Sequence, residues 1–183
     1  MKKLLIISGL LMSIVLTSCE KKSISLESLK NEYLPLEVGN YWNIGSSSIK
    51  KITGTQEFDG KSYYALTTKY DTSYVRNDNN RIIQYYKNKE YVKYDLTAHV
   101  NDTWMFRDYV VKLVSKTDTV TVGGIKFTDC YRFYFDVPGM ADEEHSVWLA
   151  SKVGFIQEEC HGECIGGKRK LTEVSISGQV FRF

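Results

Sequence analysis

Residues that could do chemistry gather near the C-terminus. Cys160, His161 and Cys164 stand close together in a run of glutamates and glycine. Together with Cys130 they could supply three thiolates and an imidazole, a donor set that zinc accepts. The Cys-His-x-x-Cys spacing is not that of a standard zinc element, and Cys130 would have to arrive from elsewhere in the fold. The sequence therefore predicts no metal site and no cofactor.

A disulfide is the alternative use of these cysteines. Cys160 and Cys164 flank a three-residue turn, across which a hairpin can bridge two cysteines. In an oxidising compartment thiols pair before they hold metal. We expect a Cys160–Cys164 disulfide. Cys130 could instead pair with either of them, although its aromatic neighbours in a strand favour a buried, inert thiol.

An acidic loop is the other candidate for chemistry. It contains Asp142, Glu143 and Glu144, with Asp136 just before it. Calcium loops alternate ligands with spacers and place a glycine at the sharp turn, whereas this run does neither. The histidines are widely separated, and no nucleophile elbow or phosphate-binding loop occurs (His99, His145, His161). We therefore predict no catalytic residue and no enzyme. A hydrolase that uses a carboxylate pair stays open, because the fold sets the geometry of such a pair.

The N-terminus carries a secretory signal. Lys2 and Lys3 precede a short apolar run, residues 4–16, which closes on Leu16-Thr17-Ser18-Cys19. This closing sequence resembles the bacterial lipoprotein box. The resemblance implies cleavage before Cys19, lipidation of Cys19, and attachment to a membrane through it. A transmembrane anchor is the alternative, but the apolar run is well short of the ~20 residues that a spanning helix needs.

The net charge of the chain without its signal peptide bears on the kinds of molecule it can bind. Removal of the signal takes away two lysines and leaves 22 basic and 22 acidic residues, a formal net charge of zero. A neutral chain argues against nucleic acid as a partner. Glu20 follows the predicted lipidation site, whereas an aspartate there is the inner-membrane retention signal of lipoproteins. We expect the outer membrane of the cell envelope, with the surface and the periplasmic face both open.

The rest of the chain has the pattern of consecutive strands. Aromatic residues make up 13 %, and turn signals such as Asp59-Gly60 and Gly123-Gly124 separate short alternating runs. In residues 90–96 the alternation separates Val92, Tyr94 and Leu96 from Tyr91, Lys93 and Asp95, as in a strand with one buried and one wet face. The sequence predicts an all-β antiparallel meander of about ten strands with little helix. A curved sheet, a sandwich and a barrel all remain possible.

The predicted organisation has three parts. Residues 1–18 form the signal peptide, residues 19–31 the lipidated cysteine and a tether, and residues 32–183 a single β domain.

Two motifs in the β domain carry a resemblance. Residues 35–42 read Pro-Leu-x-x-Gly-Asn-x-Trp and residues 148–154 read Trp-Leu-Ala-x-x-Val-Gly, with a strand pair at residues 120–131 between them. This combination behind a lipoprotein box is similar to a broad set of uncharacterised envelope lipoproteins of Bacteroidota-type bacteria. The resemblance implies a β-rich, envelope-anchored domain and brings no catalytic residues with it.

We therefore expect a lipid-anchored, non-catalytic domain that binds or scaffolds a protein, glycan or lipid ligand. One alternative is a carrier that holds a lipid or another apolar ligand inside a barrel. The carboxylate-based hydrolase is the second.

Overall fold

The computed structural model describes residues 26, 29–30, 32–45, 48–140, 143–161 and 167–183. The predicted signal peptide and Cys19 therefore lie outside the described residues. Within them the chain forms thirteen strands, and the predicted all-β antiparallel meander is confirmed. The strands are β1 (Tyr41–Ile44), β2 (Ser48–Phe58), β3 (Lys61–Thr67), β4 (Thr72–Asp78), β5 (Arg81–Tyr86), β6 (Lys89–Asp95), β7 (Thr103–Phe106), β8 (Tyr109–Val122), β9 (Ile125–Asp136), β10 (His145–Ala150), β11 (Gly154–Cys160), β12 (Lys168–Ile176) and β13 (Gln179–Arg182).

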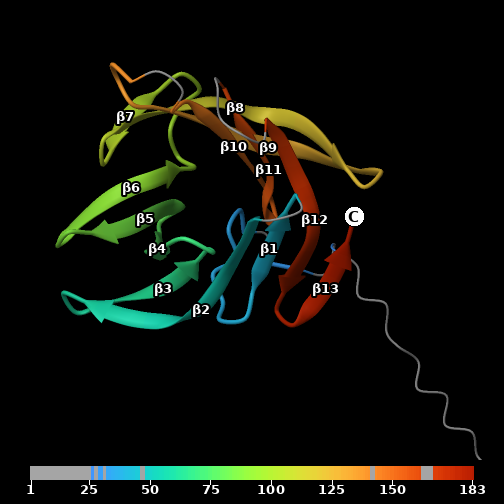
Figure 1. Cartoon of the computed structure of the whole chain (residues 1–183), viewed down its shortest axis with the longest axis horizontal. Helices are drawn as coiled ribbons and strands as arrows, with labels where there is room; N and C mark the ends of the chain where they lie inside the picture. The colour runs from blue at the N-terminus through green and yellow to red at the C-terminus, as the bar shows by residue number, and fades with distance from the viewer. Residues whose placement is uncertain (1–25, 27–28, 31, 46–47, 141–142, 162–166) are drawn as a thin grey trace, which may run out of the picture.

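The strands form one sheet that curls into a nearly closed barrel (Figure 1). Its order is β6-β5-β4-β3-β2-β1-β12-β11-β10-β9-β8-β7, with β13 added beside β12. Between the end strands β6 and β7 there is no backbone ladder. Instead, the Trp104 indole of β7 donates a hydrogen bond of 2.9 Å to the Val92 carbonyl of β6.

The predicted number of about ten strands was too low. β4 is mostly polar and β7 has four residues, so neither gives a clear alternating run in the sequence. β8 is one continuous strand of 14 residues, and its register shifts three times against β9. The hairpin turns were predicted correctly. Asp59 and Gly60 both have positive φ, as the tight turns favoured in hairpins require.

The barrel has two different ends. We call proximal the end at which residues 32–40 pack and distal the end that holds the turns at residues 68–71, 87–88 and 107–108. At the proximal end the Glu32 carbonyl accepts a 2.7 Å hydrogen bond from the Lys152 amide, and Leu34 is buried. The Trp42 indole donates to the Val153 carbonyl. Gly154 is required beside it, because its φ is +88° and an added Cβ would lie 3.0 Å from the indole nitrogen.

Aromatic rings fill the middle of the barrel. The Tyr94 ring of β6 lies 5.0 Å from Phe133 and 5.8 Å from Phe135 of β9, and 6.3 Å from Phe155 of β11. Strands from opposite sides of the barrel therefore meet through side chains. A carrier of a large apolar ligand needs an apolar cavity at this position. Four hollows of about 310–570 Å³ that are bounded by described residues lie around the proximal end.

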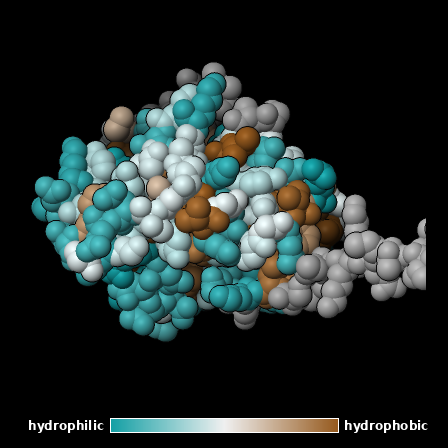
Figure 2. All heavy atoms as spheres, turned by 90° about the horizontal axis from the view of Figure 1, so that it is seen from below, coloured by the Kyte–Doolittle hydropathy of each residue, from teal (hydrophilic) through white to brown (hydrophobic). Residues whose placement is uncertain are grey.

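Large hydrophobic side chains are scattered over the outside. On the face that Figure 2 shows, they are separated from one another by hydrophilic residues. Among the described residues, no helix has the length and apolar character needed to span a bilayer.

The central ring cluster predicts a large stability effect. Phe133→Ala removes a fully buried ring that touches Tyr94, Trp104 and Tyr131. We expect a loss of about 3–5 kcal/mol in the free energy of unfolding, measured by urea denaturation. Tyr70→Ala is the control, because Tyr70 is 86 % exposed, and it should change stability by less than about 0.5 kcal/mol. Equal effects of the two variants would contradict a ring-filled interior.

Candidate functional site

Four charged side chains point into the barrel near its distal end. They come from four strands and form what we call the distal cluster: Lys50 (β2), Lys93 (β6), Glu158 (β11) and Arg169 (β12). The Lys50 ammonium lies 2.9 Å from one oxygen of Glu158, and the Arg169 guanidinium lies 3.2 Å from the other. The Lys50 and Glu158 side chains are 19 % and 12 % exposed, so both are largely withdrawn from water.

A β-bulge turns Lys93 inward. Ile82 of β5 pairs with Tyr94 and Ile83 pairs with Val92, which leaves Lys93 as the extra residue of β6. A bulge of this kind puts two successive side chains on one face of the strand. Lys93 therefore shares the inner face with Tyr94, and the predicted placement of Lys93 on the wet face of a regular strand was wrong.

Two further bulges bring in Glu158 and Arg169. In β11, Gln157 pairs with Trp148 and Phe155 pairs with Leu149, which leaves Ile156 as the extra residue. Because of this extra residue, Glu158 shares the inner face with Phe155. In β12, Asn43 pairs with Glu173 and Ile44 with Leu171. This shift places Arg169 on the inner face with Leu171, directly opposite Glu158. Lys50 needs no bulge, because it pairs with the buried Trp42.

Lys93 differs from the other members of the cluster in its surroundings. Its ammonium nitrogen lies 5.4 Å from the Phe106 ring centre and 5.8 Å from that of Tyr94. In the described part of the chain it has neither a carboxylate partner nor a hydrogen-bond acceptor. Burial, together with the nearby Lys50 charge, lowers the pKa of Lys93 to about 8.

Glu158 is the ionised centre of the cluster. Burial pushes its pKa upward, but the Lys50 ammonium and the Arg169 guanidinium outweigh burial and hold the pKa below its ordinary value. His145 lies nearby with its ring stacked 4.8 Å from that of Phe135. Burial lowers the pKa of His145, which favours the neutral imidazole at pH 7.

Gln84 adds an unpaired acceptor on the inner face of β5. Its side chain is 3 % exposed, and its amide oxygen has no hydrogen-bond partner in the structure. Ile82 of β5 pairs with Tyr94, next to the bulge residue Lys93. Gln84 is the next residue of β5 that points inward, and it lies on the distal side of Ile82. A buried acceptor without a donor is costly, and such an atom calls for an explanation such as a bound water, an ion or another group.

The possible zinc donors do not come together in the described part of the chain. Cys130 is fully buried in β9 with a free thiol, and burial raises its pKa to about 11. His145 of β10 pairs with Phe135 of β9 on one side and with Cys160 of β11 on the other. Cys130 precedes Phe135 by five residues, so it lies about 17 Å along β9 from the level of Cys160. The expectation of a buried, inert Cys130 is confirmed, and its pairing with Cys160 or Cys164 was wrong. Among the described residues, no three His, Cys, Asp or Glu side chains are placed to hold a metal ion.

The predicted Cys160–Cys164 disulfide stays a prediction. Cys160 is disulfide-bonded, and Cys164 lies outside the described residues.

The acidic loop does not form a site in the described residues. Asp136 ends β9, and Asp142 lies outside the described residues. The Glu144 carbonyl accepts a hydrogen bond from the His161 amide, and Ser146 bonds the His161 ring at 2.8 Å. These contacts tie β10 to the end of β11. Of this segment, His145 alone reaches the inner ring cluster.

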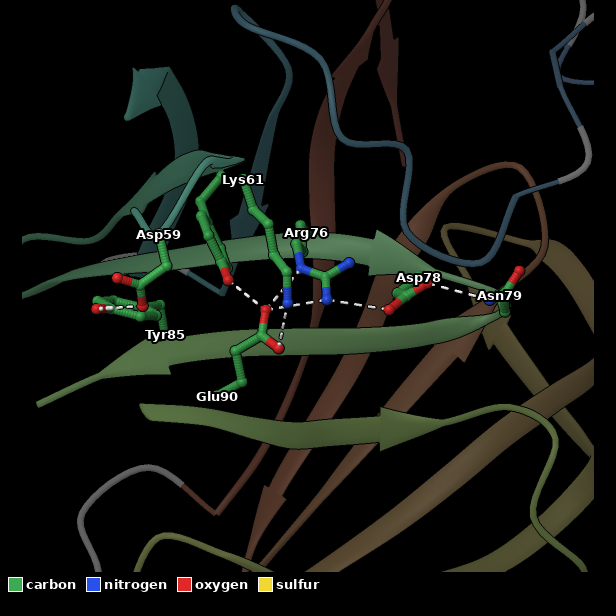
Figure 3. A network of polar contacts seen from close by, with 8 residues as sticks. Asp59, Lys61, Arg76, Asp78, Asn79, Tyr85 and Glu90 are labelled. Carbon is green, nitrogen blue, oxygen red and sulfur yellow. Dashed lines mark hydrogen bonds and ion pairs between the residues drawn. The ribbon is translucent and has the colours of Figure 1, made fainter. Parts of the chain in front are cut away.

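A second concentration of charge lies on β3–β6, on the face away from the barrel interior (Figure 3). In this outer network Glu90 accepts hydrogen bonds from Lys61 at 3.0 Å, from Arg76 at 2.9 Å and from Tyr63. Arg76 also pairs with Asp78 at 3.0 Å. Every ionised group named here has a partner, and the contacts cross from strand to strand. The outer network therefore stabilises the sheet, in contrast to the unpaired Lys93.

Sequence reasoning missed the distal cluster as a set. Glu158 stood out only as part of the cysteine-rich run, and Lys50, Lys93 and Arg169 carried no signal. A lysine between Val92 and Tyr94 fits a regular alternating strand, and bulges leave no fixed local motif, so the sequence does not reveal this one.

Comparisons with known proteins assign no family. No protein-family model and no curated protein matches the sequence. Among solved structures, the chain is similar to one described as "a putative lipoprotein from Parabacteroides distasonis ATCC 8503". The TM-score is 0.43 and the identity 11 %, over 79 % of this chain and 99 % of that chain. A likeness this low assigns no function.

The outer network predicts a specific loss of stability in acid. Hydrogen bonds from Arg76 and Tyr63 lower the Glu90 pKa to about 2 from an ordinary value of 4.5. The unfolded chain therefore binds a proton more readily, and the stability that Glu90 contributes is complete above pH 4.5 and is lost as the pH falls towards 2. Glu90→Gln should be less stable than the wild type at pH 7 and should lose less between pH 5 and pH 2, as measured by urea denaturation.

Glu57→Gln is the matched control, because Glu57 lies exposed on β2. Its acid profile should follow that of the wild type. A Glu90→Gln profile parallel to the wild type would contradict the assignment.

Proposed function

We propose that this chain is a lipid-anchored envelope protein whose β domain binds a ligand at the distal cluster and does not catalyse a reaction. The observation that carries the proposal is the placement of four charged side chains on the inner face of the barrel, at the end opposite the N-terminal segment. Lys50, Lys93 and Glu158 are largely withdrawn from water, and the Arg169 side chain is 41 % exposed. Burying charges costs stability, and a folding domain has no need of them in its interior. A binding role accounts for this cost.

The first described residues and the distal cluster lie at opposite ends of the barrel. Leu26 and Leu29 pack against the core, and Leu26 lies beside Phe127 and Val153 at the proximal end. Leu26 follows the predicted lipidation site Cys19 by seven residues, which extend at most about 25 Å. An anchor at Cys19 would hold the proximal end near the membrane and present the distal end away from it. The residue after Cys19, Glu20, favours the outer membrane, on either of its faces.

The electrostatics of the cluster favour binding over hydrolysis. A carboxylate-pair hydrolase needs one acid with a raised pKa facing a second carboxylate. Glu158 instead faces two cations that lower its pKa. It is therefore held as an ion-paired carboxylate, which can orient Lys50 and Arg169 but is a poor proton donor at neutral pH.

The anchor is tested by Cys19→Ser in the full-length chain. Without the thiol there is nothing to acylate, so we expect the protein to move from the detergent-extracted membrane fraction to the soluble envelope fraction, measured by immunoblot. Metabolic labelling with an alkyne fatty acid should mark the wild type and not the variant. A Cys19→Ser protein that stays in the membrane fraction would contradict lipid anchoring.

The binding role is tested by thermal unfolding of the mature domain with a panel of sugars, amino acids, organic acids, fatty acids and phosphates. At least one compound class should raise Tm by about 5 °C at a concentration well above its Kd. Lys50→Met should abolish this rise. Lys51→Met is the matched control, since Lys51 is the exposed neighbour on β2, and it should keep the rise. A panel without effect, or a rise that Lys50→Met leaves intact, would contradict the proposal.

A further inference from the structure

We infer that the ligand of the distal cluster is a small organic anion and that the Lys93 ammonium is its main contact. This inference rests on the proposed binding role and adds the chemical class of the ligand. Three features carry it: the charge balance inside the barrel, the aromatic rings beside Lys93, and the unpaired amide of Gln84.

Within the described part of the chain, the charge balance of the distal cluster leaves one cation without an ion-pair partner. The cations Lys50, Lys93 and Arg169 share one carboxylate, Glu158. Glu158 is already paired through both oxygens, with Lys50 at 2.9 Å and Arg169 at 3.2 Å. Glu158 and Asp71 raise the Lys93 pKa and Lys50 and Arg107 lower it, but burial has the largest effect and the pKa stays below its ordinary value. A carboxylate, phosphate or sulfonate group beside Lys93 would supply the missing charge and regain the free energy lost on its burial.

The walls around the amines are aromatic. The Phe106 and Tyr94 rings flank Lys93, and the Phe155 ring lies 5.1 Å from the Lys50 ammonium. Ring faces attract cations and also pack against apolar or ring-shaped groups. This wall favours an anion with an organic body over a bare inorganic ion.

Gln84 specifies a further feature of the ligand. Its buried amide oxygen accepts no hydrogen bond within the protein. A hydroxyl or amine on the body of the anion would donate to it. The combination of an ammonium, ring faces and an amide acceptor matches a small organic acid that carries a donor group.

Solvent reaches this place. The Arg169 side chain is 41 % exposed, and Lys50 and Glu158 keep 19 % and 12 % exposure although they point inward. Arg169, Lys50 and Glu158 are therefore the members of the cluster that an anion in solution meets first, since Lys93 is buried.

The test uses a matched pair of fluorescent probes, anionic anilinonaphthalene sulfonate and neutral phenylnaphthylamine, titrated into the mature domain. Lys93→Met should weaken binding of the anionic probe about tenfold, the loss expected for one charged hydrogen bond. Lys93→Arg should keep most of the affinity, because it keeps the charge. Binding of the neutral probe should change less than about twofold. Lys89→Met, on the exposed start of β6, is the control and should bind both probes as the wild type does.

The outcomes separate the two proposals. If Lys93→Met binds the anionic probe as tightly as the wild type while Lys50→Met loses the neutral probe, the anionic class is wrong and the binding role stands. If neither Lys50→Met nor Lys93→Met changes the affinity for either probe, the distal cluster binds neither of them and the inference is overturned. Unchanged near-ultraviolet circular dichroism of each variant confirms that it has folded.

Discussion

Three β-bulges decide which side chains enter this barrel. Side chains alternate strictly along a strand, so one extra residue exchanges the inner and outer faces beyond it. The bulges in β6, β11 and β12 bring Lys93, Glu158 and Arg169 to the inner face. Without them the same strands would direct these charges into solvent. The ion pairs, the lowered Lys93 pKa and the proposed binding role all depend on these register shifts.

The aromatic middle of the barrel makes the charged end possible. Tyr94 joins β6 to β9 and β11 through its ring contacts and directly follows the bulge residue Lys93. This packing fixes the strand on which Lys93 stands. The N-terminal segment covers the proximal end, where the Trp42 indole bonds the Val153 carbonyl. The hydrophobic packing therefore lies in the middle of the barrel, the N-terminal segment covers its proximal end, and the charged side chains lie near its distal end.

The sequence predicted the fold class better than the site. Turn pairs such as Asp59-Gly60 and the alternating aromatic runs carry local signals, and both appear in the structure as predicted. The Lys93 bulge has no such signal, because it arises from pairing with β5 and from packing across the barrel. Cys130 shows the same contrast. Its burial followed from its neighbours, whereas its distance from Cys160 depends on the register of three strands.

The central claim is that Lys93 points into the barrel. The most direct measurement is a nuclear Overhauser spectrum of the mature domain with labelled lysine and phenylalanine. The structure places the Lys93 ammonium nitrogen 5.4 Å from the Phe106 ring centre. We therefore expect cross-peaks between the Lys93 side-chain methylene protons and the Phe106 ring protons. Their absence, together with cross-peaks from Lys93 to outer-face neighbours such as Ile83, would contradict the bulge and the binding site built on it.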